Sequence, residues 1–309
     1  MSPFAPVTFY LQGSDAPVCA IFHRPERAAR ATAVVLCPPF GWDEVCSYRS
    51  RRHWAQRLAD AGYPSLRISY PGTGDSGGSP RDAGRLEAWT SAVSSAGAWI
   101  REATGANRVV AIGLGLGGLV AYRAAALGAP IDDLVIWAAP ARGRAFVRQL
   151  RAFSKMEVSQ FFEGLELPPP LPEGELEAGG FWLSAETVGE LEALDLATLP
   201  LPHAPSRRVL LLERDGIAVD SRLRETLEEQ DVELAVSPAR GYSAMTSHPQ
   251  QAHPPLEVIG LVTGWLSAFS DPAPRGASEP PESAAGEEQS AIIELGGGIR
   301  VKETPVSVE

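Results

Sequence analysis

The sequence predicts an α/β fold in which a mainly parallel sheet carries helices on both of its faces. Short apolar runs alternate with stretches of helical periodicity over most of the 309 residues. Some of these runs, such as 33–37, are continuously apolar, which is typical of strands buried on both faces. A glycine-rich turn at 113–118 joins one apolar run to a helical pattern. These observations indicate a series of βαβ units around one large core.

The elements follow in a regular order. A turn-forming stretch separates the segments 7–11 and 18–22, which therefore predict a hairpin. Further strands are predicted at 33–37, 65–70, 108–112, 134–139, 208–214 and 232–236, and helices at 48–61, 86–104, 116–127, 219–230 and 256–269. The alternation is interrupted between 142 and 205 by a basic helical patch, a proline-rich stretch and a helix with Ser184 as its N-cap.

We expect residues 1–270 to form one domain, with an insertion at about 142–205. Residues 271–290 are rich in Pro, Ser, Ala, Gly and Glu, and this composition predicts a disordered linker. Residues 291–309 contain strand-like sequence again. Two interpretations of this tail remain open: the start of a further domain in a longer chain, or a loosely docked terminus.

Composition excludes several classes of function. The net charge of −11 argues against a nucleic-acid partner, because phosphate binding requires clustered Lys and Arg. No apolar run is long enough to span a bilayer and no signal pattern is present, so we expect a cytoplasmic protein without a membrane partner. The three cysteines, Cys19, Cys37 and Cys46, are scattered and odd in number. They indicate neither a disulfide framework nor a zinc site, and we expect no metal and no cofactor.

The turn at 113–118 has a specific chemical context. A strand, a tight turn and a helix in this order hold the nucleophilic serine of G-x-S-x-G proteins at the tip of the turn. Here Gly113 and Gly117 flank the turn and Gly115 stands where that serine belongs, without a side chain that could attack a substrate. The run also contains the dinucleotide-binding pattern G-x-G-x-x-G, but that motif follows the first strand of its fold. We therefore favour the nucleophile turn.

Three segments make residues 7–269 resemble the α/β-hydrolase superfamily. They are the oxyanion-loop position at 36–41, the Y-P-G-T-G-D-S segment at 70–76 and the turn at 113–118. Within the superfamily, the P-P-F-G and G-F-W-L-S-A-E-T segments resemble those of serine aminopeptidase (S33)-like hydrolases associated with exosortase and natural-product gene clusters. The resemblance implies an α/β-hydrolase fold, a cap formed by the insertion, and a nucleophile elbow in which glycine replaces serine.

The same resemblance implies where the remaining members of a catalytic triad would lie. Asp215 follows the strand at 208–214 and takes the position of the acid, with Asp220 as the alternative. His248 is the candidate base, with His253 as the alternative, because the histidine of this fold lies in the loop before the last helix. The carboxylate of the acid would orient that histidine, as it does in a triad. The other interpretation is that Asp215 caps a helix and that both histidines are ordinary loop residues.

Other groups offer chemistry that does not need the serine. The backbone N–H groups of Phe40 and Leu116 are expected to form an oxyanion hole. Cys46 is a candidate substitute nucleophile, although its acidic neighbours would raise its pKa. A third route is a water molecule in the space beside Gly115, activated by Asp215 and His248.

The resemblance therefore implies a hydrolase-family protein with a non-standard active site that acts on an ester, a thioester or another acyl substrate. The alternatives are a pseudo-hydrolase that binds a small ligand or a partner protein, and an accessory domain of a larger biosynthetic protein. Whether the chain is an enzyme of the esterase, thioesterase or peptidase type stays open at this point. The expected partner is a small acyl molecule, with a further domain or partner protein engaged through the C-terminal tail.

Overall fold

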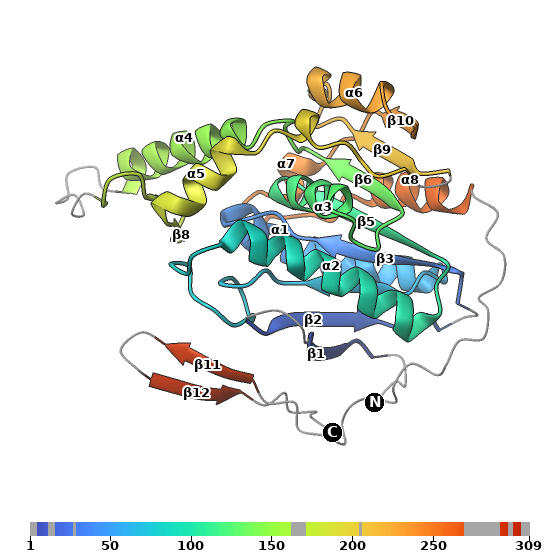
Figure 1. The fold of residues 1–309 in the computed structure, drawn as a ribbon, viewed down its shortest axis with the longest axis horizontal. Coiled ribbons are helices and arrows are strands. Elements are labelled where there is room, and N and C mark those ends of the chain that lie inside the picture. Colours follow the sequence, from blue (N-terminus) through green and yellow to red (C-terminus); the bar gives the residue numbers. More distant parts are fainter. Residues whose placement is uncertain are drawn as a thin grey trace.

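A computed structural model describes residues 5–11, 16–26, 29–161, 171–203, 206–268, 291–295 and 299–303. Its centre is an eight-stranded sheet in the order β1-β2-β4-β3-β5-β6-β9-β10 (Figure 1). The strands are β1 (Val7–Leu11), β2 (Val18–His23), β3 (Thr32–Cys37), β4 (Ser65–Ile68), β5 (Arg108–Leu114), β6 (Asp133–Trp137), β9 (Arg208–Leu212) and β10 (Glu233–Ser237).

Most of the sheet is parallel. The strands β1 and β2 form the predicted antiparallel hairpin, and β2 also pairs antiparallel with β4. All other neighbours, from β4 to β10, run parallel. The register pairs Cys37 with Gly113 and Leu114 with Trp137, so β3, β5 and β6 end at the same edge of the sheet. The prediction of a mainly parallel α/β sheet is confirmed.

Helices cover both faces of this sheet, and Figure 1 shows α2 and α3 in front of it. The helices of the body are α1 (Trp42–Asp60), α2 (Arg85–Thr104), α3 (Leu116–Ala126), α6 (Ser221–Glu228), α7 (Tyr242–Met245) and α8 (Leu256–Ser267). One buried apolar cluster joins the sheet to α2, α3 and α6, and a second joins it to α1, α7 and α8. The sheet is therefore buried on both faces, as its continuously apolar strands require.

The helix α1 begins at Trp42, earlier than the predicted start at 48. Gly41, which precedes it, has φ 70 and ψ −135, a conformation that favours glycine and turns the chain directly from β3 into the helix. In the C-terminal tail, β11 (Ala291–Leu295) and β12 (Ile299–Glu303) pair as an antiparallel hairpin. The predicted linker at 271–290 lies outside the described residues.

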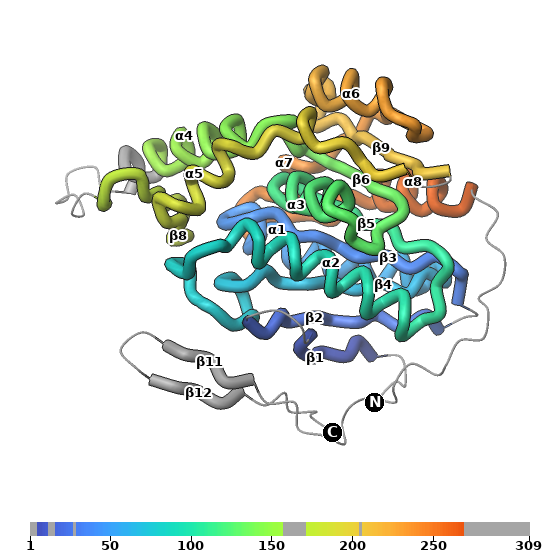
Figure 2. Tube along the Cα trace, viewed as in Figure 1, coloured from blue at the N-terminus to red at the C-terminus, as the bar shows by residue number. Residues whose placement is uncertain are grey.

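The chain between β6 and β9, here called the 142–203 segment, forms a separate group of elements. Their bounds are α4 (Gly143–Phe161), β7 (Leu176–Ala178), β8 (Phe181–Leu183), α5 (Ala185–Ala193) and η1 (Leu196–Thr198). Figure 2 shows α4 and α5 side by side beyond one end of the sheet. The side chain of Ser184 accepts a hydrogen bond from the N–H of Thr187 at 3.2 Å, so the N-cap of α5 is confirmed.

A buried ionic cluster joins three neighbouring strands at the opposite edge of the sheet. The carboxylate of Asp133, which is 0% exposed, accepts hydrogen bonds from Arg108 on β5 at 2.7 Å and from Arg208 on β9 at 2.9 Å. It also accepts the backbone N–H of Arg208 at 2.8 Å. One carboxylate thus connects β5, β6 and β9 where these strands begin.

Among the described helices, none has both the length and the apolar character needed to cross a membrane.

Candidate active site

The turn between β5 and α3 has an unusual backbone. Gly115 has φ 52 and ψ −119, a conformation that side chains of L-residues rarely adopt. Its N–H donates a hydrogen bond to the carbonyl oxygen of Trp137 at 2.9 Å, which holds the turn against the end of β6. A Cβ at Gly117 would collide with the carbonyl oxygen of Cys37, so the turn also packs tightly against the end of β3.

The space beside Gly115 is filled by the side chain of Tyr242. The Tyr242 hydroxyl lies 2.9 Å from the position that a Cβ on Gly115 would take. Tyr242 is 1% exposed, and its ring packs edge-on against Trp137 with 5.2 Å between the ring centroids. The hydroxyl donates a hydrogen bond to Oδ2 of Asp43 at 3.3 Å. A side chain from the first turn of α7 therefore stands where a side chain at position 115 would point.

Burial and the neighbouring Asp43 carboxyl keep the Tyr242 hydroxyl protonated and neutral. Burial raises its pKa well above the ordinary value of a tyrosine, and the carboxyl of Asp43 adds to this effect. Burial also raises the pKa of Asp43, while Arg214 and the Tyr242 hydroxyl act in the opposite direction. The Arg214 guanidinium stacks over the Tyr242 ring, with 4.8 Å from its central carbon to the ring centroid. At neutral pH the tyrosine is thus a hydrogen-bond donor and not a base.

The two N–H groups predicted to form an oxyanion hole lie at the ends of β3 and β5. Leu116 is the first residue of α3, and Phe40 follows the Pro38-Pro39 pair after β3. Within the part of the chain that the structure describes, neither N–H has a hydrogen-bond acceptor. The Phe40 ring is buried against Trp89 at 5.8 Å, Phe181 at 6.0 Å and Phe146 at 6.5 Å between centroids. The 142–203 segment therefore packs on Phe40.

Asp215 lies just after β9 and is exposed. Its carboxylate accepts hydrogen bonds from the N–H groups of Gly241 and Ser243 and from the Ser243 hydroxyl. Partial burial acts to raise its pKa, but these donors outweigh that effect and hold the pKa below its usual value. Asp220, the alternative acid, caps α6 by accepting the N–H of Arg222 at 3.1 Å, and it also accepts the N–H of Ala141 at 2.9 Å.

The two histidines lie on the surface. His248 is exposed; its Nδ1 accepts a long hydrogen bond of 3.5 Å from the N–H of Gln250, and its ring centroid lies 6.2 Å from that of Trp42. His253 is exposed as well. Among the described residues, no hydrogen bond or ion pair joins either histidine to Asp215 or Asp220. The structure brings Asp215 to the residues around Tyr242 and does not connect it to His248.

The cysteines considered as nucleophiles are buried thiols. Burial raises the pKa of Cys46 to about 11, and the nearby Asp43 carboxylate acts in the same direction. Burial also raises the pKa of Cys37 to about 12. Because the thiolate is the nucleophilic form, both groups are unreactive at neutral pH.

Tyr242 and Arg214 belong to no motif in the sequence, and Asp43 stands out there only as an acidic neighbour of Cys46. Histidine is the residue type that indicates a general base in a sequence. A tyrosine after a glycine does not indicate a catalytic role, so the sequence does not predict one for Tyr242. The signal in the sequence is the distance along the chain: Tyr242 lies five residues after the end of β10 at Ser237, whereas His248 lies beyond α7.

Comparison with solved structures shows the same fold in several hydrolases. The structure of Est1E from Butyrivibrio proteoclasticus with bound ferulic acid has a TM-score of 0.58 and 15% identity, and the match covers 84% of this chain and 98% of that one. The structure of DcsB with its substrate analogue has a TM-score of 0.59 and 16% identity, and the match covers 85% of this chain and 99% of that one. The structure of alpha/beta hydrolase domain-containing protein 10 from mouse has a TM-score of 0.52 and 17% identity, and the match covers 85% of this chain and 99% of that one.

A comparison with curated proteins found no match. The model of the alpha/beta hydrolase family, in contrast, matches residues 34–254, which is more than half of the chain and runs from β3 to the loop before α8. The matched residues contain the parallel strands, the turn at Gly115 and the loop that carries Tyr242. The chain therefore belongs to the alpha/beta hydrolase family.

Proposed function

We propose that this chain binds a small acyl or other carbonyl ligand without forming a covalent acyl-enzyme. The observation that carries the proposal is the Tyr242 hydroxyl, which occupies the space beside Gly115 that a nucleophilic side chain would need. An acyl-enzyme requires a nucleophile in that space and a base beside it. Here the first position is a glycine and the second is a neutral phenol.

The arrangement has the order of a catalytic triad with two of its members replaced. In a triad, the acid orients the base and the base contacts the nucleophile. Asp215 accepts the N–H groups on both sides of Tyr242, and the Tyr242 side chain reaches Gly115. In this proposal Tyr242 stands in the position of the histidine and Gly115 in that of the serine. Because the pKa of Tyr242 is raised well above 10, it does not accept a proton at neutral pH.

The features that hold a ligand are still present. The N–H groups of Phe40 and Leu116 have no acceptor among the described residues, and such a pair of donors suits a carbonyl oxygen. The 142–203 segment contacts Phe40 through Phe146 and Phe181 and acts in this proposal as the cap over the ligand. The ferulic acid in Est1E and the substrate analogue in DcsB support a small organic ligand.

The proposal also concerns the subfamily of the alpha/beta hydrolases to which the chain belongs. The Gly180–Thr187 stretch that resembles S33-like hydrolases forms β8 and the start of α5, within the proposed cap. In this proposal the chain is an S33-like hydrolase in which glycine replaces the elbow serine.

The test combines a covalent probe with ligand binding. The wild-type protein is expected to show no labelling by a fluorophosphonate probe and no turnover of p-nitrophenyl esters of short acids. Calorimetry is expected to detect binding of uncleaved acyl esters. The Gly115→Ser/Tyr242→His double variant is expected to gain fluorophosphonate labelling, whereas Gly115→Ser alone is expected to stay unlabelled because Tyr242 still fills the space.

A second candidate is slow hydrolysis by a non-standard site, favoured by the retained N–H donors at Phe40 and Leu116. Wild-type turnover that disappears in Cys46→Ala or His248→Ala would establish this function and overturn the first. Turnover that survives both substitutions and disappears in Tyr242→Phe would assign the reaction to the tyrosine instead.

A further inference from the structure

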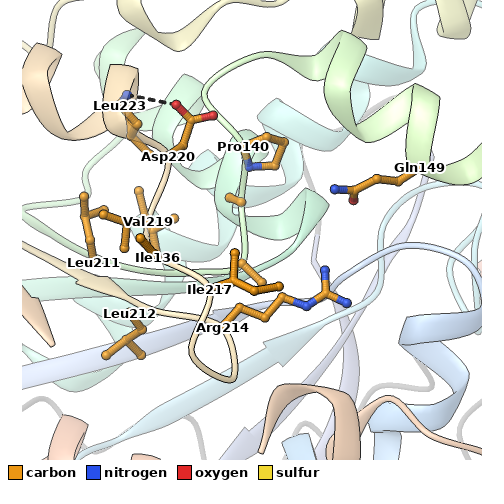
Figure 3. A pocket seen from close by; sticks show the side chains of 13 residues that line it. Ile136, Pro140, Gln149, Leu211, Leu212, Arg214, Ile217, Val219, Asp220 and Leu223 are labelled. Atoms are coloured by element: carbon orange, nitrogen blue, oxygen red, sulfur yellow. Dashed lines mark hydrogen bonds between the residues drawn. The ribbon is translucent and has the colours of Figure 1, made fainter. Parts of the chain in front are cut away.

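A cavity of about 240 Å³ lies beside the candidate active site, where β6 and β9 end (Figure 3). Its wall consists mainly of apolar side chains, including Ile136, Leu211, Val219 and Leu223. Pockets for drug-sized ligands have volumes of about 300–1,000 Å³, so this one suits a smaller molecule. The apolar wall predicts that a hydrocarbon body fills most of the space.

One positive charge faces this apolar cavity. Arg214 lines it, and Figure 3 shows the guanidinium on the same side as the amide of Gln149. The guanidinium lies over the Tyr242 ring and acts electrostatically on the Asp43 carboxyl, and it makes no direct hydrogen bond to any residue that the structure describes. A guanidinium has five N–H donors in a fixed geometry that matches a carboxylate.

The negative charge at the cavity is already neutralised by its neighbours. Asp220 also lines the wall, and its oxygens accept the N–H groups of Ala141 and Arg222 at the start of α6. A carboxylate that accepts backbone N–H groups at a helix N-terminus is compensated locally. Among the residues that line the cavity, Arg214 is the group that can attract an anion.

The backbone around the cavity is strained. Three non-glycine residues with positive φ occur among the described residues: Ala138, Ser206 and Asp215. Ala138, with φ 61, lines the cavity, and Asp215, with φ 52, directly follows Arg214. Such conformations are costly for residues other than glycine and cluster at functional sites. Two of the three lie here, which supports a binding role for this edge of the sheet.

We propose that the cavity binds a small monocarboxylate with an apolar body, whose carboxylate pairs with Arg214. A phosphate monoester fits less well, because it carries nearly two negative charges and one guanidinium compensates only one of them. The inference does not depend on the proposed function, since it uses neither Gly115 nor the N–H groups of Phe40 and Leu116. It assigns a second ligand site at the ends of β6 and β9.

The experiment compares hexanoate and octanoate with 1-octanol by calorimetry on the full chain. Octanoate is expected to bind more tightly than 1-octanol. Arg214→Gln is expected to weaken octanoate binding by at least about tenfold, the range for losing a hydrogen bond to a charged group, and to leave 1-octanol unaffected. Arg224→Gln is the matched control, because Arg224 is an exposed arginine on α6 that pairs with Glu228 outside the cavity.

Two further variants keep the proposal testable if Arg214→Gln does not fold. Ala218→Trp fills the cavity from its exposed edge and is expected to abolish octanoate binding, and Arg214→Lys is expected to retain part of it. Equal binding of octanoate and 1-octanol, or octanoate binding that is unchanged in Ala218→Trp, would overturn the proposal.

Discussion

Gly115 and Tyr242 share one small volume, and each limits what the other can be. A Cβ at position 115 would approach the Tyr242 hydroxyl to 2.9 Å, and it would also sit on a backbone with positive φ. Tyr242 cannot move aside easily, because its ring is buried against Trp137.

We therefore expect Gly115→Ser to lower the free energy of unfolding by about 1–3 kcal/mol, the usual cost of overpacking. Tyr242→Phe removes the hydroxyl that collides, so the double variant is expected to lose less than the sum of the two single losses. Urea unfolding of the four proteins in the cycle measures this coupling. Strictly additive losses would show that the two side chains do not compete for space.

Cys46 provides a second prediction at the scale of one residue. Its pKa is raised to about 11 and its side chain is buried, so its thiolate is scarce at pH 8. All three cysteines are free and buried. Folded protein is expected to react with a disulfide reagent such as Ellman's at pH 8 far more slowly than protein in urea, in which all three thiols react. Rapid reaction of one thiol in the folded protein, lost in Cys46→Ala, would restore Cys46 as a nucleophile.

At the scale of elements, Asp215 fixes the short helix α7 and so holds Tyr242 in place. Its pKa is lowered in the folded protein by the donors of residues 241 and 243. A carboxyl group with a lowered folded pKa contributes stability above its unfolded pKa of about 3.9, and this contribution disappears as the pH falls through the folded value.

Asp215→Asn resembles the protonated acid, so its melting temperature is expected to lie below that of the wild type at pH 7. The two curves are expected to converge as the pH falls below about 4. Thermal unfolding between pH 7 and pH 3 checks this, with Glu225→Gln, an exposed carboxyl on α6, as the control that follows the wild type. A constant gap at all pH values would mean that the charge of Asp215 does not hold α7.

The strands and helices were predictable because their signals are local. Continuous apolar runs predict β3, β5 and β6, and Ser184 predicts the start of α5. The pairing of Tyr242 with Gly115 was not predictable in this way, because 127 positions separate the two residues and neither type suggests a catalytic site. The start of α1 was placed too late because Gly41 acts through its backbone conformation, which apolar periodicity does not reveal.

At the scale of the whole molecule, the buried carboxylate of Asp133 joins three strands through two arginines, the buried Arg208 and the partly buried Arg108. Removing one partner of a buried ionic group leaves the others without compensation, which costs about 3–5 kcal/mol. Asp133→Ala is expected to lose this amount in urea unfolding. Asp132→Ala is the matched control, because the Asp132 carboxyl, which accepts hydrogen bonds from Arg101 and from the N–H of Val109, is partly exposed and contributes less. Equal losses of unfolding free energy in the two variants would show that the Asp133 cluster stabilises the fold no more than the partly exposed Asp132–Arg101 ion pair does.

The filled space beside Gly115 has a consequence for how this chain can evolve. Enzymes give up stability to keep reactive groups in strained and open surroundings, so activity and stability oppose each other. Under the proposed function, the Tyr242 hydroxyl lies where a nucleophilic side chain would need room, and glycine suits the positive φ of the turn. Substitutions that would ruin a catalyst are then tolerated by the scaffold, which leaves the 142–203 segment and the neighbouring cavity free to acquire new ligands.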